Sequence, residues 1–208
     1  MDGRTGLGGR VRIVSETVLS DDWARLTRYE VDYRRADGTV QRQVRQAYDR
    51  GDGAAILPYD SDRGTVLLGR QFRLVALLNG HDDLLIEVAA GLLDAADPAT
   101  RIRAETEEEL GLVLHDVREV FDIFMSPGSV TERLHLFVAR YAAADRTGAG
   151  GGVAAEGEEI DVLEPTLTEA LDWIATGRIR DAKTIVLLQY AALHLFPGAS
   201  GTARGDRP

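Results

Sequence analysis

Four glutamates lie close together near the end of the stretch 98–110, which is expected to be helical. They are Glu105, Glu107, Glu108 and Glu109. Each carboxylate near a helix C-terminus is unfavourable by about 0.3–1 kcal/mol, and Glu105 and Glu109 also form a like-charged pair four residues apart. Glu105, Glu108 and Glu109 share one helix face, whereas Glu107 points elsewhere. A divalent cation such as Mg²⁺ would offset this repulsion, because it prefers carboxylate and carbonyl oxygens.

The alternative is a solvated acidic face, in which Arg101 and Arg103 pair with the glutamates four residues further on. The segment before the helix favours the metal site. Ala90-Gly91 follows the apolar run 84–88, and the small residues let the backbone come close to the helix. A backbone carbonyl there can face the same carboxylates. A strand, a glycine loop and a helix with convergent carboxylates together have the architecture of a metal site.

A second acidic motif, Glu156-Gly157-Glu158-Glu159-Ile160, follows the small-residue segment 142–155. That composition predicts a mobile loop, and the motif is either part of a closing lid or an acidic solvated linker. Arg45, Arg70 and Arg73 are candidates for contacts to a diphosphate, because the guanidinium fork matches phosphate geometry. The alternative for each arginine is an ordinary surface charge.

Composition excludes several classes of protein. The chain has 208 residues, no cysteine, and 24 Lys and Arg against 34 Asp and Glu, which gives a net charge of −10. An acidic surface disfavours nucleic acid binding, and the lack of cysteine excludes disulfides and thiolate metal sites. The sequence has no apolar run of the length that a membrane span needs and no secretory signal, so we expect no membrane partner and a cytoplasmic location.

The elements that must position these residues follow from periodicity. Tyr29, Val31 and Tyr33 alternate with charged residues, which predicts a strand within an N-terminal antiparallel meander. Asp97 before Pro98 and the later Gly111 predict a helix over 98–110. We expect further strands near 117–124 and 134–140 and helices near 167–176 and 182–195. The predicted domains are a β subdomain at 1–50, a main domain at 51–196 and a disordered tail at 197–208.

The stretch Ala90-Gly91-Leu92-Leu93-Asp94, with Glu105-Thr106-Glu107-Glu108-Glu109-Leu110-Gly111-Leu112, resembles the Nudix box G-x5-E-x7-R-E-U-x-E-E-x-G-U. Counted from Gly91 the box is one residue short, and Thr106 stands at the first U. Ala104 replaces the arginine, which bears on how the glutamates are oriented, and Arg103 is the neighbouring substitute. The early glutamate position holds Ala96 or Asp97.

The resemblance extends over roughly residues 11–195, to the Nudix branch that cleaves nucleoside diphosphate sugars. It is closest to the GDP-mannose pyrophosphatases and next to the ADP-ribose pyrophosphatases. The segments that carry it are Arg70-Gln71-Phe72-Arg73, Ile86-Glu87, Met125-Ser126-Pro127-Gly128-Ser129-Val130-Thr131-Glu132 and Ile179-Arg180-Asp181-Ala182-Lys183-Thr184. It implies an α+β fold, a Nudix α/β/α sandwich with a mixed sheet, preceded by a small N-terminal antiparallel β meander.

The resemblance also implies roles for single residues. The implied cofactor is Mg²⁺, with Mn²⁺ as the alternative cation. The implied metal ligands are Glu105, Glu109, Glu158 and the carbonyl of Ala90. The implied catalytic residues are Glu156, as the candidate general base, and Glu108, as a further ligand or a partner of the ligands. The implied substrate contacts are Arg45, Arg73, Glu132 and Lys183.

The expected function is therefore hydrolysis of a nucleoside diphosphate sugar to a nucleoside monophosphate and a sugar phosphate. The alternative is a catalytically inactive sensor of the same ligand, which the missing box arginine favours, although the chain leaves little room for an output domain. The resemblance further implies a homodimer whose N-terminal strands cross to the partner, so that Arg45 or Trp23 serves the neighbouring subunit's substrate. The alternative is a monomer in which the meander packs on its own chain.

Overall fold

The structure is a computed structural model that describes residues 5–196, apart from the side chain of Glu156. The predicted tail at 197–208 lies outside the described residues. The chain forms two compact units, one of residues 1–52 with 124–133 and the other of residues 53–123 with 134–208. The domain boundary after residue 50 stays a prediction.

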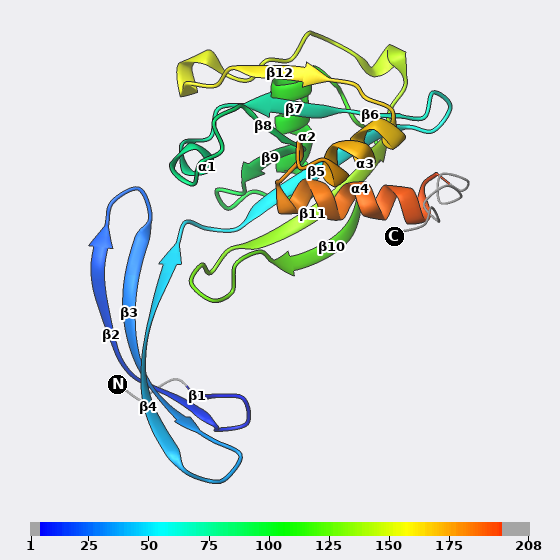
Figure 1. Cartoon of the computed structure of the whole chain (residues 1–208). Coiled ribbons are helices and arrows are strands. Elements are labelled where there is room, and N and C mark those ends of the chain that lie inside the picture. Colours follow the sequence, from blue (N-terminus) through cyan, green and yellow to red (C-terminus); the bar gives the residue numbers. More distant parts are fainter. Residues whose placement is uncertain (1–4, 197–208) are drawn as a thin grey trace. The chain divides into compact units, whose positions relative to one another are not determined.

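The N-terminal unit is built on an antiparallel sheet with the strand order β1-β2-β3-β4 (Figure 1). Val11 pairs with Tyr33 and Ile13 with Val31, so the alternation seen in the sequence produces one apolar stripe across two strands. Two register shifts interrupt the pairing of β2 with β3. The strands are β1 Thr5–Gly6, β2 Val11–Asp21, β3 Arg25–Arg34 and β4 Val40–Asp49.

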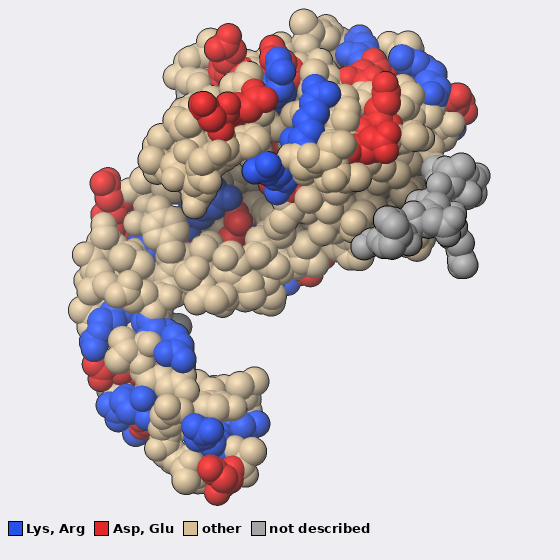
Figure 2. Space-filling model, in the orientation of Figure 1, with Lys and Arg blue, Asp and Glu red and all other residues tan. Residues whose placement is uncertain are grey.

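Charged side chains also pair across this sheet. Asp32 contacts Arg12 at 2.6 Å and Arg42 at 2.5 Å, and Glu30 contacts Arg28 at 2.9 Å. Figure 2 shows acidic and basic side chains intermingled on the face in view. Exposed ion pairs of this kind contribute at most about 1 kcal/mol each. Most of the sheet's stability must therefore come from its backbone ladder and its apolar stripe.

The second unit has a five-stranded mixed sheet with the order β10-β11-β5-β6, and β9 pairs with β5 as well. The central strand β5 is parallel to β11 and antiparallel to β6 and β9. A separate three-stranded sheet has the order β12-β7-β8. The strands are β5 Gly53–Asp60, β6 Thr65–Val66, β7 Leu68–Gln71, β8 Leu85–Glu87, β9 Ala89–Leu92, β10 Arg118–Phe124, β11 Arg133–Arg140 and β12 Ile160–Leu163.

Helices cover both faces of this central sheet (Figure 1). Helix α2 packs on β5 and β9, whereas α4 packs on β5 and against α3. The α+β sandwich with a mixed sheet and an N-terminal meander, expected from the sequence, is confirmed. The helices are α1 Leu74–Leu78, α2 Pro98–Leu110, α3 Leu167–Ala175 and α4 Ala182–His194, with 3-10 turns η1 Ala143–Asp145 and η2 Ala154–Glu156. No described helix is long and apolar enough to span a membrane.

Helix α2 begins and ends at the residues that the sequence predicted. The Asp97 side chain accepts a hydrogen bond from the backbone N–H of Thr100, and Pro98 opens the first turn. Gly111 ends the helix at φ 66°, a left-handed conformation that glycine adopts without strain. On the inner face Ile102 and Leu110 are fully buried, and they join the core beneath β5. The two termini thus fix the bounds of the helix that carries the glutamates.

Candidate active site

Glu105 lies against the backbone of β9 at Gly91. The carboxylate is 5% exposed, and a Cβ atom added at Gly91 would stand 1.8 Å from Oε1 and 2.3 Å from Cδ of Glu105. Only glycine therefore permits this approach. Ala90, whose carbonyl was predicted as a ligand, is the neighbouring residue of the same strand and pairs with Ala55 of β5. The glycine that the sequence placed in a loop thus lies in strand β9, where it meets the first glutamate of the acidic helix.

Arg101 bridges the same strand and the same glutamate. Its Nε donates to the carbonyl oxygen of Leu92 at 3.1 Å, and its Nη2 lies 2.5 Å from Oε1 of Glu105. This pairing belonged to the alternative of a solvated acidic face, and it is present, but the Glu105 carboxylate is buried rather than solvated. Arg103 instead donates to backbone carbonyls, that of Ala99 at 3.1 Å and that of His115 at 3.3 Å.

Glu109 is the second carboxylate that the helix buries, and it is 3% exposed. Burial is the main reason why the pKa of its carboxyl is raised to about 8. The negative charges of Glu105, Glu87 and Glu158 raise this pKa further, whereas the positive charge of Arg73 lowers it. Four carboxylates from three segments, which are α2, β8 and the segment before β12, thus act on one another.

Glu87 also belongs to this cluster, although the sequence alone assigned it no role in the site. It ends β8, is 2% exposed, and accepts from Arg73 Nε and from Lys183 Nζ, each at 2.6 Å. Lys183 also contacts Asp181 at 3.0 Å, the residue that caps α4. The available signal was a lone glutamate inside the apolar run 84–88.

The charges of Glu87 and its neighbours also act on these two cations. Burial lowers the pKa of Lys183, but the charges of Glu87 and Asp181 outweigh burial and raise it. For Arg73 the lowering by burial is likewise outweighed, by the charges of Glu87 and Glu109 among others. Both side chains therefore stay cationic beside the carboxylate cluster.

The glycine-rich segment, which composition predicted to be mobile, is bonded to the end of α2. The N–H of Gly151 donates to the carbonyl of Glu109 at 3.0 Å, and that of Gly152 donates to the carbonyl of Glu108 at 3.1 Å. A few residues later, Glu158 folds back so that its Oε2 accepts from the N–H of Val153 at 2.9 Å. These bonds explain why the charge of Glu158 acts on Glu109.

The structure does not place the side chains of the two predicted catalytic residues, Glu108 and Glu156, in the buried cluster. Glu108 lies on α2 between buried positions, but its side chain is exposed, so it does not share the buried face of Glu105 and Glu109. The backbone of Glu156 forms part of η2, and its side chain lies outside the described part of the structure.

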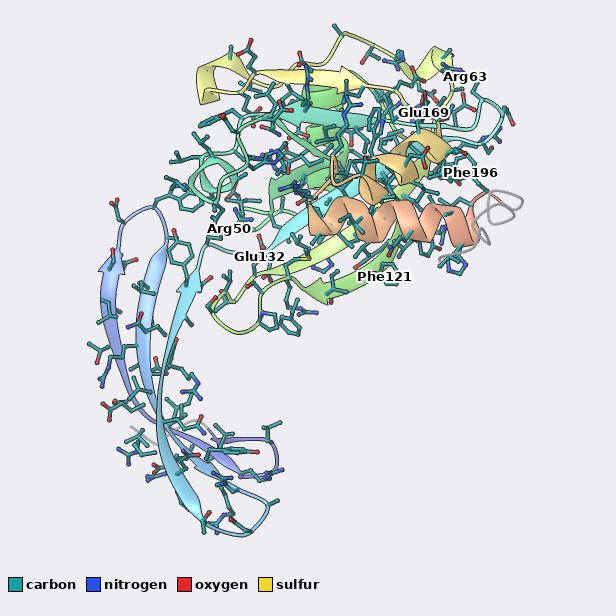
Figure 3. The ribbon with its side chains drawn as sticks, in the orientation of Figure 1. Arg50, Arg63, Phe121, Glu132, Glu169 and Phe196 are labelled. Carbon is teal, nitrogen blue, oxygen red and sulfur yellow. The ribbon has the colours of Figure 1, made fainter. Side chains whose placement is uncertain are left out.

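Arg45 and Glu132, the remaining predicted substrate contacts, belong to the N-terminal unit. Arg45 is exposed on β4, where it donates to the side chain of Gln43. Glu132 is 8% exposed and forms an ion pair with Arg50, as Figure 3 shows. Trp23, at the turn between β2 and β3, is 69% exposed.

A cavity of about 660 Å³ opens elsewhere, at the C-terminal ends of β5 and β11. None of the predicted site residues lines it. Asp60 on its wall accepts from two backbone N–H groups, and Arg140 pairs with Asp62 at 2.6 Å. Because these groups already have partners, we take the carboxylate cluster rather than this cavity as the candidate site.

The cluster is not a finished metal site. Among residues 5–196, leaving aside the Glu156 side chain, no three His, Asp or Glu side chains are arranged to hold a metal ion. Arg101 holds an oxygen of Glu105, and Arg73 and Lys183 hold those of Glu87. The donors nevertheless fit a divalent cation, because they are buried carboxylates. One of them, Glu105, lies against the backbone of β9 at Gly91, where a side chain would overlap it.

Comparison with known proteins identifies the family. Residues 10–48 match the model of the GDP-mannose pyrophosphatase NudK N-terminal domain. The chain is 48% identical to a GDP-mannose pyrophosphatase of Pectobacterium atrosepticum, over 88% of this chain and 94% of the relative. It is 46% identical to those of Klebsiella pneumoniae, over 86% and 90%, and of Escherichia coli O1:K1, over 90% and 98%.

The chain belongs to the Nudix family of nucleoside diphosphate sugar pyrophosphatases. The resemblance inferred from the Nudix box is thereby confirmed. Nudix hydrolases generally use a divalent metal, in agreement with the donors at the carboxylate cluster. Hydrolysis is the expected function that these relatives support, and nothing in the comparisons favours the inactive sensor.

Proposed function

We propose that this Nudix hydrolase cleaves the pyrophosphate bond of GDP-mannose, releasing GMP and mannose 1-phosphate. Water adds its oxygen to one phosphorus, and the bond from that phosphorus to the bridging oxygen breaks. The observation that carries the proposal is the buried carboxylate cluster beside two fixed cations, in a chain 46–48% identical to proteins named GDP-mannose pyrophosphatases. The alternative substrate is ADP-ribose.

The proposed metal ligands are Glu105, Glu109, Glu158 and the carbonyl of Ala90, and the proposed ion is Mg²⁺, with Mn²⁺ as the alternative. A bound divalent cation supplies Lewis-acid polarisation of the phosphoryl oxygens and activation of water. The support is electrostatic: Glu109 is buried among three further negative charges, and a divalent cation would compensate them. We assign Glu156 as the general base and Glu108 as a further acidic group at the site.

Arg73 and Lys183 are the proposed diphosphate contacts. Each donates to one oxygen of the buried carboxylate of Glu87, which holds both cations beside the cluster. An anionic diphosphate placed between these cations and a divalent cation held by the metal ligands would have its charge offset on both sides. Because Arg73 carries a planar fork and Lys183 a single ammonium group, Arg73 is better suited to bind two phosphate oxygens at once.

We further propose a homodimer, built on an N-terminal subdomain of residues 1–50 that precedes a catalytic domain at 51–196. The N-terminal unit exposes large apolar side chains, among them Val18 at 51%, Trp23 at 69% and Val40 at 56%. A sheet of few strands gains stability by covering its apolar side chains, which a second copy can do. Arg45 and Glu132 would then contact substrate in the dimer. We propose the cytoplasm as its location.

A product screen tests the proposed function. The protein is incubated with Mg²⁺ and separately with GDP-mannose, ADP-ribose, UDP-glucose and a nucleoside triphosphate, and nucleoside monophosphate release is followed by chromatography. We expect GDP-mannose to be turned over with the highest kcat/KM. Release of GMP that is equal in the Glu109→Gln variant, or turnover of none of the four, would contradict the proposal.

A further inference from the structure

The guanidinium of Arg101 makes two contacts with different partners. Its Nε donates to the Leu92 carbonyl at the end of β9, and its Nη2 contacts Oε1 of Glu105 one helical turn further on. Because the guanidinium is planar and rigid, the contact with the strand fixes its direction, and its Nη2 then holds one oxygen of the carboxylate at a defined place. The same Oε1 stands 1.8 Å from where a Cβ at Gly91 would be, so the carboxylate is held against the strand.

We propose that Arg101 is a positioning residue, which holds the Glu105 carboxylate over β9 in the orientation that metal binding requires. This inference rests on the proposed function, in which Glu105 is a metal ligand. The Nudix box has an arginine where this chain has Ala104, and Arg103 was its neighbouring substitute. Arg103 donates to Ala99 and His115 instead, so the orienting contact comes from Arg101.

Orientation and charge predict opposite results when Arg101 is removed. A positive charge next to a carboxylate ligand repels a cation, so if only the charge mattered, removal would strengthen Mg²⁺ binding. If orientation matters, removal weakens binding, because the carboxylate must then be ordered at the moment of binding. Lysine separates the two effects, since it keeps the charge but cannot reproduce the two-sided contact of the fork.

Arg103 supplies a matched control on the same helix. Like Arg101 it is a half-buried arginine with two hydrogen bonds, but both go to backbone carbonyls, one in α2 and one after it. Arg103→Met therefore removes a comparable side chain and comparable bonds without touching Glu105. Any effect that comes only from weakening α2 should appear in both arginine variants.

The experiment titrates MgCl₂ into the metal-free, full-length protein without substrate, by calorimetry and by the shift in melting temperature. The variants are Arg101→Met, Arg101→Lys and Arg103→Met, and the metal-free melting temperature reports whether each is folded. We expect both Arg101 variants to bind Mg²⁺ about tenfold or more weakly than the wild type. Arg103→Met should bind within about twofold of the wild type, as expected for a change that leaves the ligands in place.

Three results would overturn the inference. Wild-type affinity in Arg101→Lys, or tighter binding in Arg101→Met, would show that Arg101 acts through its charge alone. Equally weak binding in Arg103→Met would show a general loss of helix structure. Absence of Mg²⁺ binding by the wild type would contradict the metal site of the proposed function and this inference with it.

Discussion

Substituting Gly91 by alanine perturbs the candidate site by a single methyl group. The new Cβ would stand 1.8 Å from Oε1, 2.3 Å from Cδ and 2.7 Å from Cγ of Glu105, whereas ordinary contact begins near 3.4 Å. The carboxylate must therefore move by about 1.6 Å, which is the difference between 3.4 and 1.8 Å. A misplacement of about 1 Å can reduce a catalytic rate about 100-fold.

We expect Gly91→Ala to lower kcat about 100-fold and the free energy of unfolding by about 1–3 kcal/mol, the usual range for overpacking. Turnover of GDP-mannose and urea unfolding measure the two effects. Gly148→Ala is the matched control, because its Cβ would meet Gly150 at 3.9 Å, an ordinary contact. We expect this control to keep wild-type turnover.

A double-mutant cycle with Glu105→Ala isolates the steric cause. The three clashing atoms all belong to the Glu105 side chain beyond Cβ, so Glu105→Ala removes every one of them. Gly91→Ala should then cost almost no stability in the Glu105→Ala background. The reasoning would be refuted by an undiminished stability cost in that background, or by wild-type turnover in Gly91→Ala itself.

Four further predictions concern the cluster and the assembly. Glu109→Gln should abolish most turnover while leaving metal-free stability equal or higher, because glutamine resembles the neutral form of a carboxyl whose pKa burial raises to about 8. Near-normal turnover at saturating Mg²⁺ would contradict the metal role. Mg²⁺ at 100 times its Kd should stabilise the native protein by about 2.7 kcal/mol, and identical melting curves in millimolar Mg²⁺ and in chelator would count against a preformed site. Glu87→Gln should cost about 3 kcal/mol of unfolding free energy, because it breaks the buried pairs with Arg73 and Lys183, and should raise KM more than it lowers kcat; an unchanged urea midpoint would disprove that role. Sedimentation of the full chain at micromolar concentration should give a dimer, and a fully active monomer would refute the proposed assembly.

Local chemistry let the sequence predict the acidic helix closely. Asp97, Pro98 and Gly111 act through their own backbone and nearest neighbours, so the bounds of α2 could be inferred without tertiary structure. The pairing between Arg101 and Glu105 also depends only on helical spacing, although the sequence offered it as part of a solvated acidic face. Alternation of Tyr29, Val31 and Tyr33 likewise predicted β3, because side chains on a strand alternate between faces.

Tertiary structure alone decided which of these groups meet and which are buried. Glu108 and Glu109 are adjacent and chemically identical, yet packing of α2 against β5 and β9 buries Glu109 and leaves Glu108 exposed. Glu87 gains its partners only because β8, the segment after β7 and the first turn of α4 converge, and their residues are far apart in the chain. Burial and long-range charge depend on this three-dimensional packing, so no local pattern in the sequence encodes them.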